Sequence, residues 1–485
     1  MPRSVASRKV GGFAALVLCL VPATAFAQEL KAPDDETTLK GEANGLSADA
    51  VGKRAAETSY QAKAAEQTLR GAAARVDAAW AAFLPRLTTV ASYTRLSELT
   101  PPTLGTLVGA KTPPGTPITD FNQLITTPLS FPILLNNYLL QATITVPISD
   151  YFLRINQNYT AATHARDAAK YDVASAKTKS AADGKIAFYN WLRAKGTVIV
   201  AKLALEDQKT HLTDTRNLAT AGNATQVDVL RGETAVASSE LVVVQAQNLL
   251  DLSEKQLRIA MHVDDATPVV SGETLDAAAL PSVQGNLAAL INEAQSQRFE
   301  VRSIDANAES ARQAAKVQRA GAYPIVTAFA DGVIANPNQR IFPQTDTFTP
   351  TWDVGARITW SPNDIPTALA GAADFESRAA NLLAQKQVIR DGVAIEVTQS
   401  FQSVQEADFA VGSTEKQLAS AREAVRVARE LFKAGRVNST TLTDAETELT
   451  RARLSLLNAR IEARTARVRL EHSLGRDSRL VQLNP

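Results

Sequence analysis

Two stretches of the sequence, Leu218–Glu233 (LATAGNATQVDVLRGE) and Leu431–Glu446 (LFKAGRVNSTTLTDAE), repeat one another. A leucine, an Ala-Gly pair and a glutamate stand at the same places in both. Upstream of each lies a second matching pair, Gln141–Asp150 (QATITVPISD) and Gly355–Asp364 (GARITWSPND), with nearly the same separation along the chain. This period is far longer than that of a solenoid repeat. The chain therefore consists of two copies of one half-protein.

Two prolines, Pro85 and Pro324, mark where a helix gives way to strands in each copy. They lie farther apart than the segments that follow them, so the first copy holds about 25 additional residues before Ile144. Each copy is expected to contain an Ala-rich helix, two short strands and two very long helices. The Ala-rich helices, at about 46–83 and 287–322, end at these prolines because proline lacks a donor and disfavours helix before it.

Alternation of apolar and polar residues predicts four strands. They lie at about 87–96, 141–150, 324–335 and 352–362, and the second and fourth alternate most clearly. A tilted strand of roughly 10 residues has the length that crosses an outer membrane. By pattern alone, a half-buried strand of a soluble sheet stays the more common alternative.

Heptad spacing, sustained over four heptads in each copy, predicts long helices packed as coiled coils. The seam positions are Leu442, Ala445, Leu449, Ala452, Leu456, Ala459, Ala463, Ala466 and Leu470 in the second copy, and Val229, Gly232, Val236, Ser239, Val243, Ala246, Leu250, Ser253, Leu257 and Ala260 in the first. The segment 155–218 contains no proline and would form a helix roughly 95 Å long. Glycine at Ala221-Gly222 and Ala434-Gly435 suits a helix C-cap and a tight reversal. Both hairpin tips should therefore point to the same end, far from the strands.

The predicted sheet is too small to stand alone in a membrane. Two strands per copy give four per chain, and four strands cannot close a barrel, whereas open sheet edges are not tolerated in lipid. Bacterial barrels use eight or more strands. Closure requires several chains, and a dimer would leave too narrow a lumen for a transport duct, which favours a trimer.

The order of these features resembles the outer-membrane efflux protein family, of which TolC is the best known. The resemblance covers about residues 46–475 and rests on the duplicated helix–Pro–strand entries, the TVPISD segment and the two hairpin tips. It implies a mainly α fold with a small β part: a homotrimeric 12-stranded outer-membrane β-barrel continued by a periplasmic α-helical coiled-coil tunnel. The implied function is a passive exit duct of a tripartite efflux or type I secretion system. The implied partners are outer-membrane lipid, a periplasmic adaptor protein and an inner-membrane RND or ABC transporter.

The following boundaries are predicted for the parts of the chain. They are a signal peptide at 1–27, a linker at 28–45, a first repeat at 46–284 with an extracellular loop at 97–140 and a helix hairpin at 151–262, a second repeat at 285–475 with a hairpin at 366–475, and a tail at 476–485.

In that family, carboxylates just after the second tip line the periplasmic constriction. By this resemblance Asp444 matches the second acid of the family's motif, whereas Thr441 departs from the first, and Asp228 of the first copy could supply part of the ring. Three related carboxylates on a narrow pore would favour cations and help to hold the closed state. Both acids could equally be exposed groups that complement a helix dipole.

The hairpin tips are the expected docking sites for the adaptor. The candidates by position in the family are Gly222, Val227, Gly435 and Val437. The two glycines could also serve only to form the turns.

The N-terminus has the pattern of a secretory signal: a charged start, a short apolar run and the small-x-small site Ala25-Phe26-Ala27. Cleavage is expected between Ala27 and Gln28. The only cysteine, Cys19, lies in the apolar run, and Leu18 before it is too large for a lipoprotein site. The mature chain is therefore expected to have no disulfide and no thiol nucleophile.

Other functions lack support in the sequence. Lys plus Arg number 51 against 50 acids, so no basic excess indicates nucleic acid. The four histidines are isolated on helical stretches, and no phosphate loop, serine elbow or metal motif occurs. We therefore expect no cofactor, no metal and no enzyme activity. The alternative is a soluble periplasmic coiled-coil scaffold or adaptor, which would not need two amphipathic strand pairs.

Overall fold

The computed structural model describes residues 41–42, 45–98, 105–128, 133–265, 267–275 and 285–477. The predicted signal peptide with its cleavage site Ala27–Gln28, Cys19, most of the linker and most of the tail lie outside the described residues.

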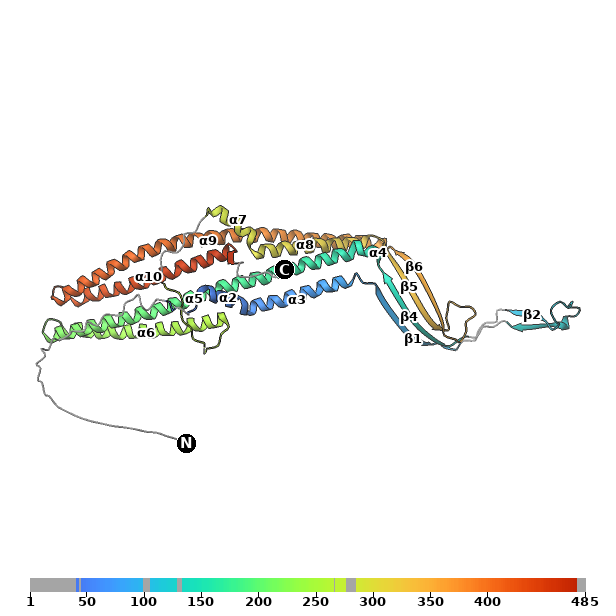
Figure 1. The fold of residues 1–485 in the computed structure, drawn as a ribbon, viewed down its shortest axis with the longest axis horizontal. Coiled ribbons are helices and arrows are strands. Elements are labelled where there is room, and N and C mark those ends of the chain that lie inside the picture. Colours follow the sequence, from blue (N-terminus) through green and yellow to red (C-terminus); the bar gives the residue numbers. More distant parts are fainter. Residues whose placement is uncertain are drawn as a thin grey trace, which may run out of the picture.

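The molecule is a long slab of helices with a sheet at one end (Figure 1). The helices are α2 (Ala48–Thr58), α3 (Tyr60–Ala81), a short α4 (Ile148–Asp150), α5 (Asn156–Thr220), α6 (Gln226–Met261), α7 (Leu287–Gln297), α8 (Phe299–Arg319), α9 (Ile365–Lys433) and α10 (Ser439–Ser473). Two of them, α5 with 65 residues and α9 with 69, run the length of the slab. The expected long helices are thereby confirmed.

The helices lie side by side across the width of the slab, in a different order in each half. In the half that carries the tips the order is α6, α5, α10, α9, and in the half nearer the sheet it is α3, α5, α8, α9. Thus α5 and α9 continue throughout while their neighbours change. One long edge of the slab is formed by α6 and α3, with α2 packed on α5 between them, and the other is formed by α9, against which α7 packs midway along its length.

The two Ala-rich helices are not continuous, and the prediction was wrong on this point. The first breaks at Ser59, whose extended backbone (φ −53°, ψ 127°) separates α2 from α3 and whose hydroxyl accepts the N–H of Ala62. The second breaks at Arg298 (φ −61°, ψ 130°), between α7 and α8. The guanidinium of Arg298 forms ion pairs at 3.0 Å with Glu300 and with Glu396 of α9. Tertiary pairing therefore stabilises a break that no glycine or proline marks.

The main sheet is antiparallel with the order β1-β4-β5-β6. Its strands are β1 (Arg86–Arg95), β4 (Asn136–Val146), β5 (Ile325–Asn336) and β6 (Thr349–Thr359). Strand β1 follows α3 and strand β6 precedes α9, so the open edges of the sheet continue the two edges of the slab (Figure 1).

The stretch 97–140, predicted as a loop, contains more regular structure than expected. It holds the hairpin of β2 (Thr106–Ala110) and β3 (Leu124–Pro128), which projects beyond the main sheet, and the start of β4. Its prolines and glycines favoured a loop, but the short β-branched runs TLVGA and LITTP suit paired strands.

The register of the sheet separates an apolar face from a polar one. Leu87, Ile144, Ala330 and Val354 are successive partners across the four strands. One residue along, the row is Thr88, Thr143, Asp331 and Asp353. Because side chains alternate along a strand, the two rows lie on opposite faces. The sheet thus has one face suited to lipid and one suited to water.

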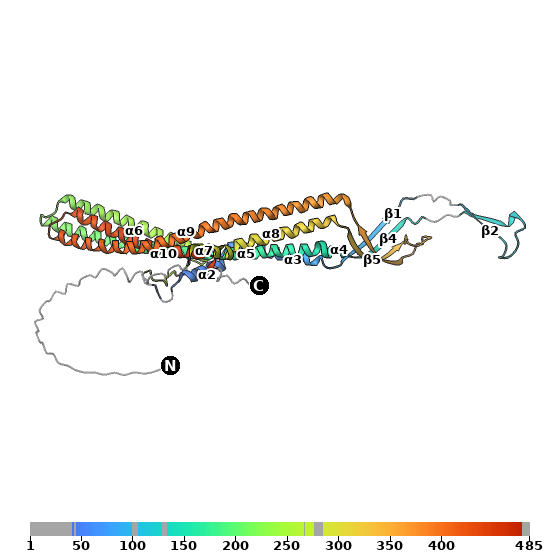
Figure 2. The ribbon, with the colours of Figure 1, turned by 90° about the horizontal axis from the view of Figure 1, so that it is seen from above.

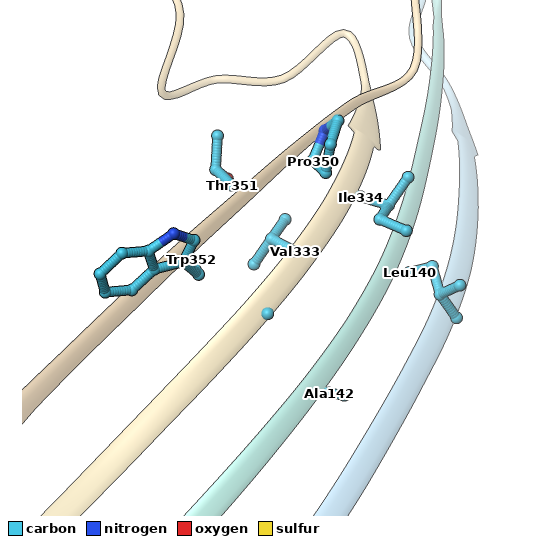
Figure 3. Close-up of a pocket in the computed structure, with 8 residues that line it drawn as sticks. Leu140, Ala142, Val333, Ile334, Pro350, Thr351 and Trp352 are labelled. Atoms are coloured by element: carbon cyan, nitrogen blue, oxygen red, sulfur yellow. The ribbon is translucent and has the colours of Figure 1, made fainter.

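The far end of the sheet continues the apolar face. Figure 3 shows this region, where Leu140, Ile334 and Trp352 come from three adjacent strands and line a shallow hollow. The side chain of Trp352 is among the most exposed large apolar groups, so nothing in the described chain covers this face.

Alternating large and small residues pack α9 against α10. The predicted seam positions Leu449 and Ala452 are buried, and they meet Leu418 and Val425 of α9. In α6 every predicted seam position is buried or half-buried. The heptad prediction is therefore confirmed for both hairpins.

Among the described residues no helix is long and apolar enough to cross a membrane.

The two helical tips as the candidate functional site

The two hairpins reverse at the same end of the molecule, opposite the sheet (Figures 1 and 2). Gly222 (φ 76°) and Gly435 (φ 68°) adopt the left-handed conformation at the two turns. At the first turn the N–H of residue 223 donates to the carbonyl of Leu218 at 2.8 Å, and at the second the N–H of residue 436 donates to Leu431 at 2.9 Å. Both copies thus end their helices in the same Schellman-type turn. The glycines are required by the turns, whatever else they do.

The helices that leave the tips begin with matching caps. Thr225 and Asp228 form a capping box at the start of α6, in which Asp228 accepts the backbone N–H of Thr225 at 3.1 Å. At the equivalent place in α10, Asn438 accepts the N–H of Thr441 at 2.9 Å. Side-chain oxygens thereby satisfy free N–H groups in both first turns.

The structure gives two of the three constriction candidates these local roles. Hydrogen bonds donated by Thr225 hold the pKa of Asp228 below its ordinary value, so this carboxylate is ionised at neutral pH and turned toward its own helix start. Thr441 also donates its hydroxyl to Asn438, at 2.7 Å. Asp444, by contrast, lies exposed on α10 and takes no part in the cap.

The two valines considered for docking differ in environment. Val227 is 55% exposed on α6. Val437 is half-buried and packs with Phe432 and Leu442 inside the second tip. Of the two, Val227 presents the free apolar surface.

A charged cluster around one buried glutamate lies behind the tips and was not predicted from the sequence. Glu446 of α10 is 3% exposed, and its carboxylate lies 3.2 Å from the guanidinium of Arg429 of α9. Gln208 of α5 donates to the other carboxylate oxygen at 3.3 Å. Arg429 also lies 3.5 Å from Asp207 of α5, and Asp207 lies 3.2 Å from Arg453 of α10. The cluster thus joins three helices and both hairpins.

His211 of α5 lies beside this cluster. Its Nε2 is 2.9 Å from the hydroxyl of Ser439 at the start of α10, and its ring centre lies 5.2 Å from that of Phe432. Burial lowers the pKa of His211, so the imidazole is neutral at neutral pH. The hydrogen bond therefore holds the first turn of α10 against α5, and the ring contact holds the end of α9 against the same histidine.

Within the part of the chain that the structure describes, no group of His, Cys, Asp or Glu side chains could hold a metal ion.

Comparison with known proteins identifies the family. The family model described as outer membrane efflux protein matches residues 51–261 and 290–476, which is most of the chain. The chain belongs to the outer membrane efflux protein family. Direct comparison with curated protein sequences finds no match.

Solved channel structures share the fold of this efflux protein. The outer-membrane channel OprN superposes with a TM-score of 0.69 at 19% identity, over 91% of this chain and 95% of that one. VceC of Vibrio cholerae gives 0.68 at 17% identity, over 88% of this chain and 96% of that one. The open state of MtrE of Neisseria gonorrhoeae gives 0.68 at 16% identity, over 88% of each chain.

Family membership gives this protein its function and place. It is an outer-membrane channel component of an efflux system, with a long helical extension on the periplasmic side. The family and the fold are those of channels rather than enzymes.

Proposed function

We propose that three copies of this efflux protein form one passive duct, with each copy supplying a third of its wall. The observation that supports this is the coincidence of open edges. One edge of the chain runs through α6, α3 and β1, and the other runs through β6 and α9. A chain with two unlike edges binds head to tail, and such contacts can close into a ring. Three copies of the four-stranded sheet would give a closed barrel of 12 strands.

The side chains along one edge support such an interface. The helix α6 exposes Leu230, Leu241, Leu252 and Ile259, each between 53% and 61% exposed. Their spacing places them on one stripe of the helix, opposite its buried seam with α5. A long apolar stripe on an isolated chain indicates a surface that is covered in the assembly.

The duct would have its mouth in the outer membrane and its tips in the periplasm. The apolar face of the sheet, with Leu87, Ile144 and Val354, would contact lipid, while the row with Asp331 would face water. We propose that an adaptor docks at the tips, where Val227 is exposed, and that an inner-membrane RND or ABC transporter delivers the cargo. Asp444 is the constriction candidate that takes no part in a helix cap, and Asp228 and Thr441 stay candidates beside it.

A soluble scaffold is the alternative function. It is disfavoured by the sheet, because Trp352 and Val354 are 78% and 70% exposed and a water-soluble monomer would gain nothing from this apolar face.

Conductance across planar bilayers tests the duct. Purified protein should insert as discrete, long-lived channels of uniform conductance. Protein that is folded and membrane-inserted but never conducts, at any pH or voltage applied, would contradict the proposal.

A further inference from the structure

The cluster around Glu446 contains more acids than bases among the described residues. The helix α5 contributes Asp207 and Asp214, α9 contributes Arg429, and α10 contributes Arg453 beside Glu446 itself. His211 of α5, whose pKa is lowered by burial, also lies beside the cluster. Asp207 and Glu446 pair with the two guanidinium groups, whereas Asp214 acts on Glu446 through its charge. These three acids and two bases would be balanced by one added proton.

Glu446 is the carboxyl group best placed to take that proton. Its side chain is 2% exposed, whereas that of Asp207 is 28% exposed and lies near both arginines. Burial is the largest influence and raises the pKa of Glu446 to about 7, although Arg429 lowers it. The nearby charges of Asp207 and Asp214 raise it further.

We propose that Glu446 is a proton-sensitive positioning residue, whose buried carboxyl joins α10 to the first hairpin and whose ionisation loosens that joint. The inference rests on the proposed function, because α10 also carries Asp444 at the candidate constriction. How firmly α10 is held against α5 would set the position of that acid.

The direction of the effect follows from proton linkage. A glutamate exposed by separation of the hairpins titrates near the ordinary value of 4.5, whereas the buried Glu446 has a pKa of about 7. Between these values the packed state binds more protons than the separated state. The contribution of Glu446 to the joint is therefore fully present below pH 4.5 and is lost as the pH rises through 7. The equilibrium constant for packing of α10 against the first hairpin should fall roughly tenfold between about pH 6 and about pH 8.

Amide hydrogen exchange of the whole mature protein tests the joint. Protection of residues 439–450, corrected for the intrinsic pH dependence of exchange, should fall roughly tenfold over that interval. Glu446→Gln keeps the shape of the side chain and an acceptor oxygen but cannot ionise. In this variant the protection of residues 439–450 should not change with pH. Asp214→Asn removes one acid that raises the pKa of Glu446. The loss of protection should therefore be complete at a lower pH, and the part of it that falls between about pH 6 and about pH 8 should be smaller.

The duplication supplies a matched control. Glu233 occupies the position in α6 that Glu446 occupies in α10, but its side chain is 46% exposed and pairs with Arg216 at 2.7 Å. Glu233→Gln should therefore keep the pH dependence of the unmodified protein. A flat profile in the unmodified protein, or a fall that persists in Glu446→Gln, would overturn the inference.

Channel conductance of the same preparations separates this inference from the proposed function. Loss of protection that depends on Glu446 supports the joint even if the protein fails to conduct, in which case only the duct is contradicted. If the channels conduct but the pH dependence of amide protection is the same in Glu446→Gln as in the unmodified protein, the joint is contradicted and the duct is not.

Discussion

At the scale of single residues, the two tips show one motif used in two environments. The pair Thr225–Asp228 caps α6, and the pair Asn438–Thr441 caps α10 at the equivalent place. Farther along, the aligned glutamates diverge, because α6 forms an edge of the slab whereas α10 lies between α5 and α9. The same helical position is therefore at the surface in the first copy and enclosed in the second.

Asp444 offers a direct prediction at this scale. Replacing Asp444 by Ala should weaken any preference for cations, because it removes one exposed carboxylate per chain from the candidate constriction. It should also raise single-channel conductance, because that carboxylate would help to hold the closed state. Glu448→Ala is the control, since that carboxylate is already paired with Arg451. Bilayer recordings at low ionic strength make the charge effect largest. If Asp444→Ala and the parent protein conduct and select alike, Asp444 does not lie at the constriction.

The residues of the candidate site could be predicted from the sequence only in part. The turn glycines Gly222 and Gly435 could be found, because a tight reversal after a helix needs a left-handed residue. The repeat also revealed that Glu233 and Glu446 correspond. That only Glu446 is buried could not be predicted, since burial depends on which helices lie beside α10. For the same reason Val437 was proposed as a docking residue although it packs inside its tip.

At the scale of elements, the proposed trimer accounts for the exposed apolar face of α6. Its apolar stripe should be the contact with the next copy, so Leu241→Glu combined with Leu252→Glu should dissociate the assembly. Each substitution would bury an unpaired carboxylate, which costs several kcal/mol. Cross-linking in detergent followed by gel electrophoresis measures the loss.

The control for α6 places the same charge on a helix that forms no edge. Asn458 is exposed on α10, so Asn458→Glu should leave the assembly intact. Equal assembly in the α6 double variant and the parent protein would show that the stripe is not the interface.

Long, periodic elements were the part of the fold most open to prediction. Heptad spacing identified both hairpins, because a seam of large and small residues is repeated many times along each helix. The breaks at Ser59 and Arg298 were missed, since a hydrogen bond from Ser180 of α5 to Ser59 and the ion pair of Arg298 with Glu396 form only in the folded chain. The hairpin of β2 and β3 was also missed, because its strands are short and lie among prolines. The boundaries of the two repeats stay predictions.

At the scale of the whole molecule, both the helical slab and the main sheet end in open edges. Apart from α2 and α7, which pack on α5 and α9 midway along the molecule, the helices form one layer, and its two edges continue into the edges of the sheet (Figures 1 and 2). A single chain therefore leaves apolar helix and sheet surfaces in contact with solvent. Sister copies would cover those surfaces and pair the free strands β1 and β6.

The mass of the intact particle tests this account most directly. Native mass spectrometry of protein extracted from outer membranes in detergent should show a particle of three mature chains that persists on dilution. A stable, monodisperse single chain that needs no detergent would contradict the account, because its open edges would then require no partner.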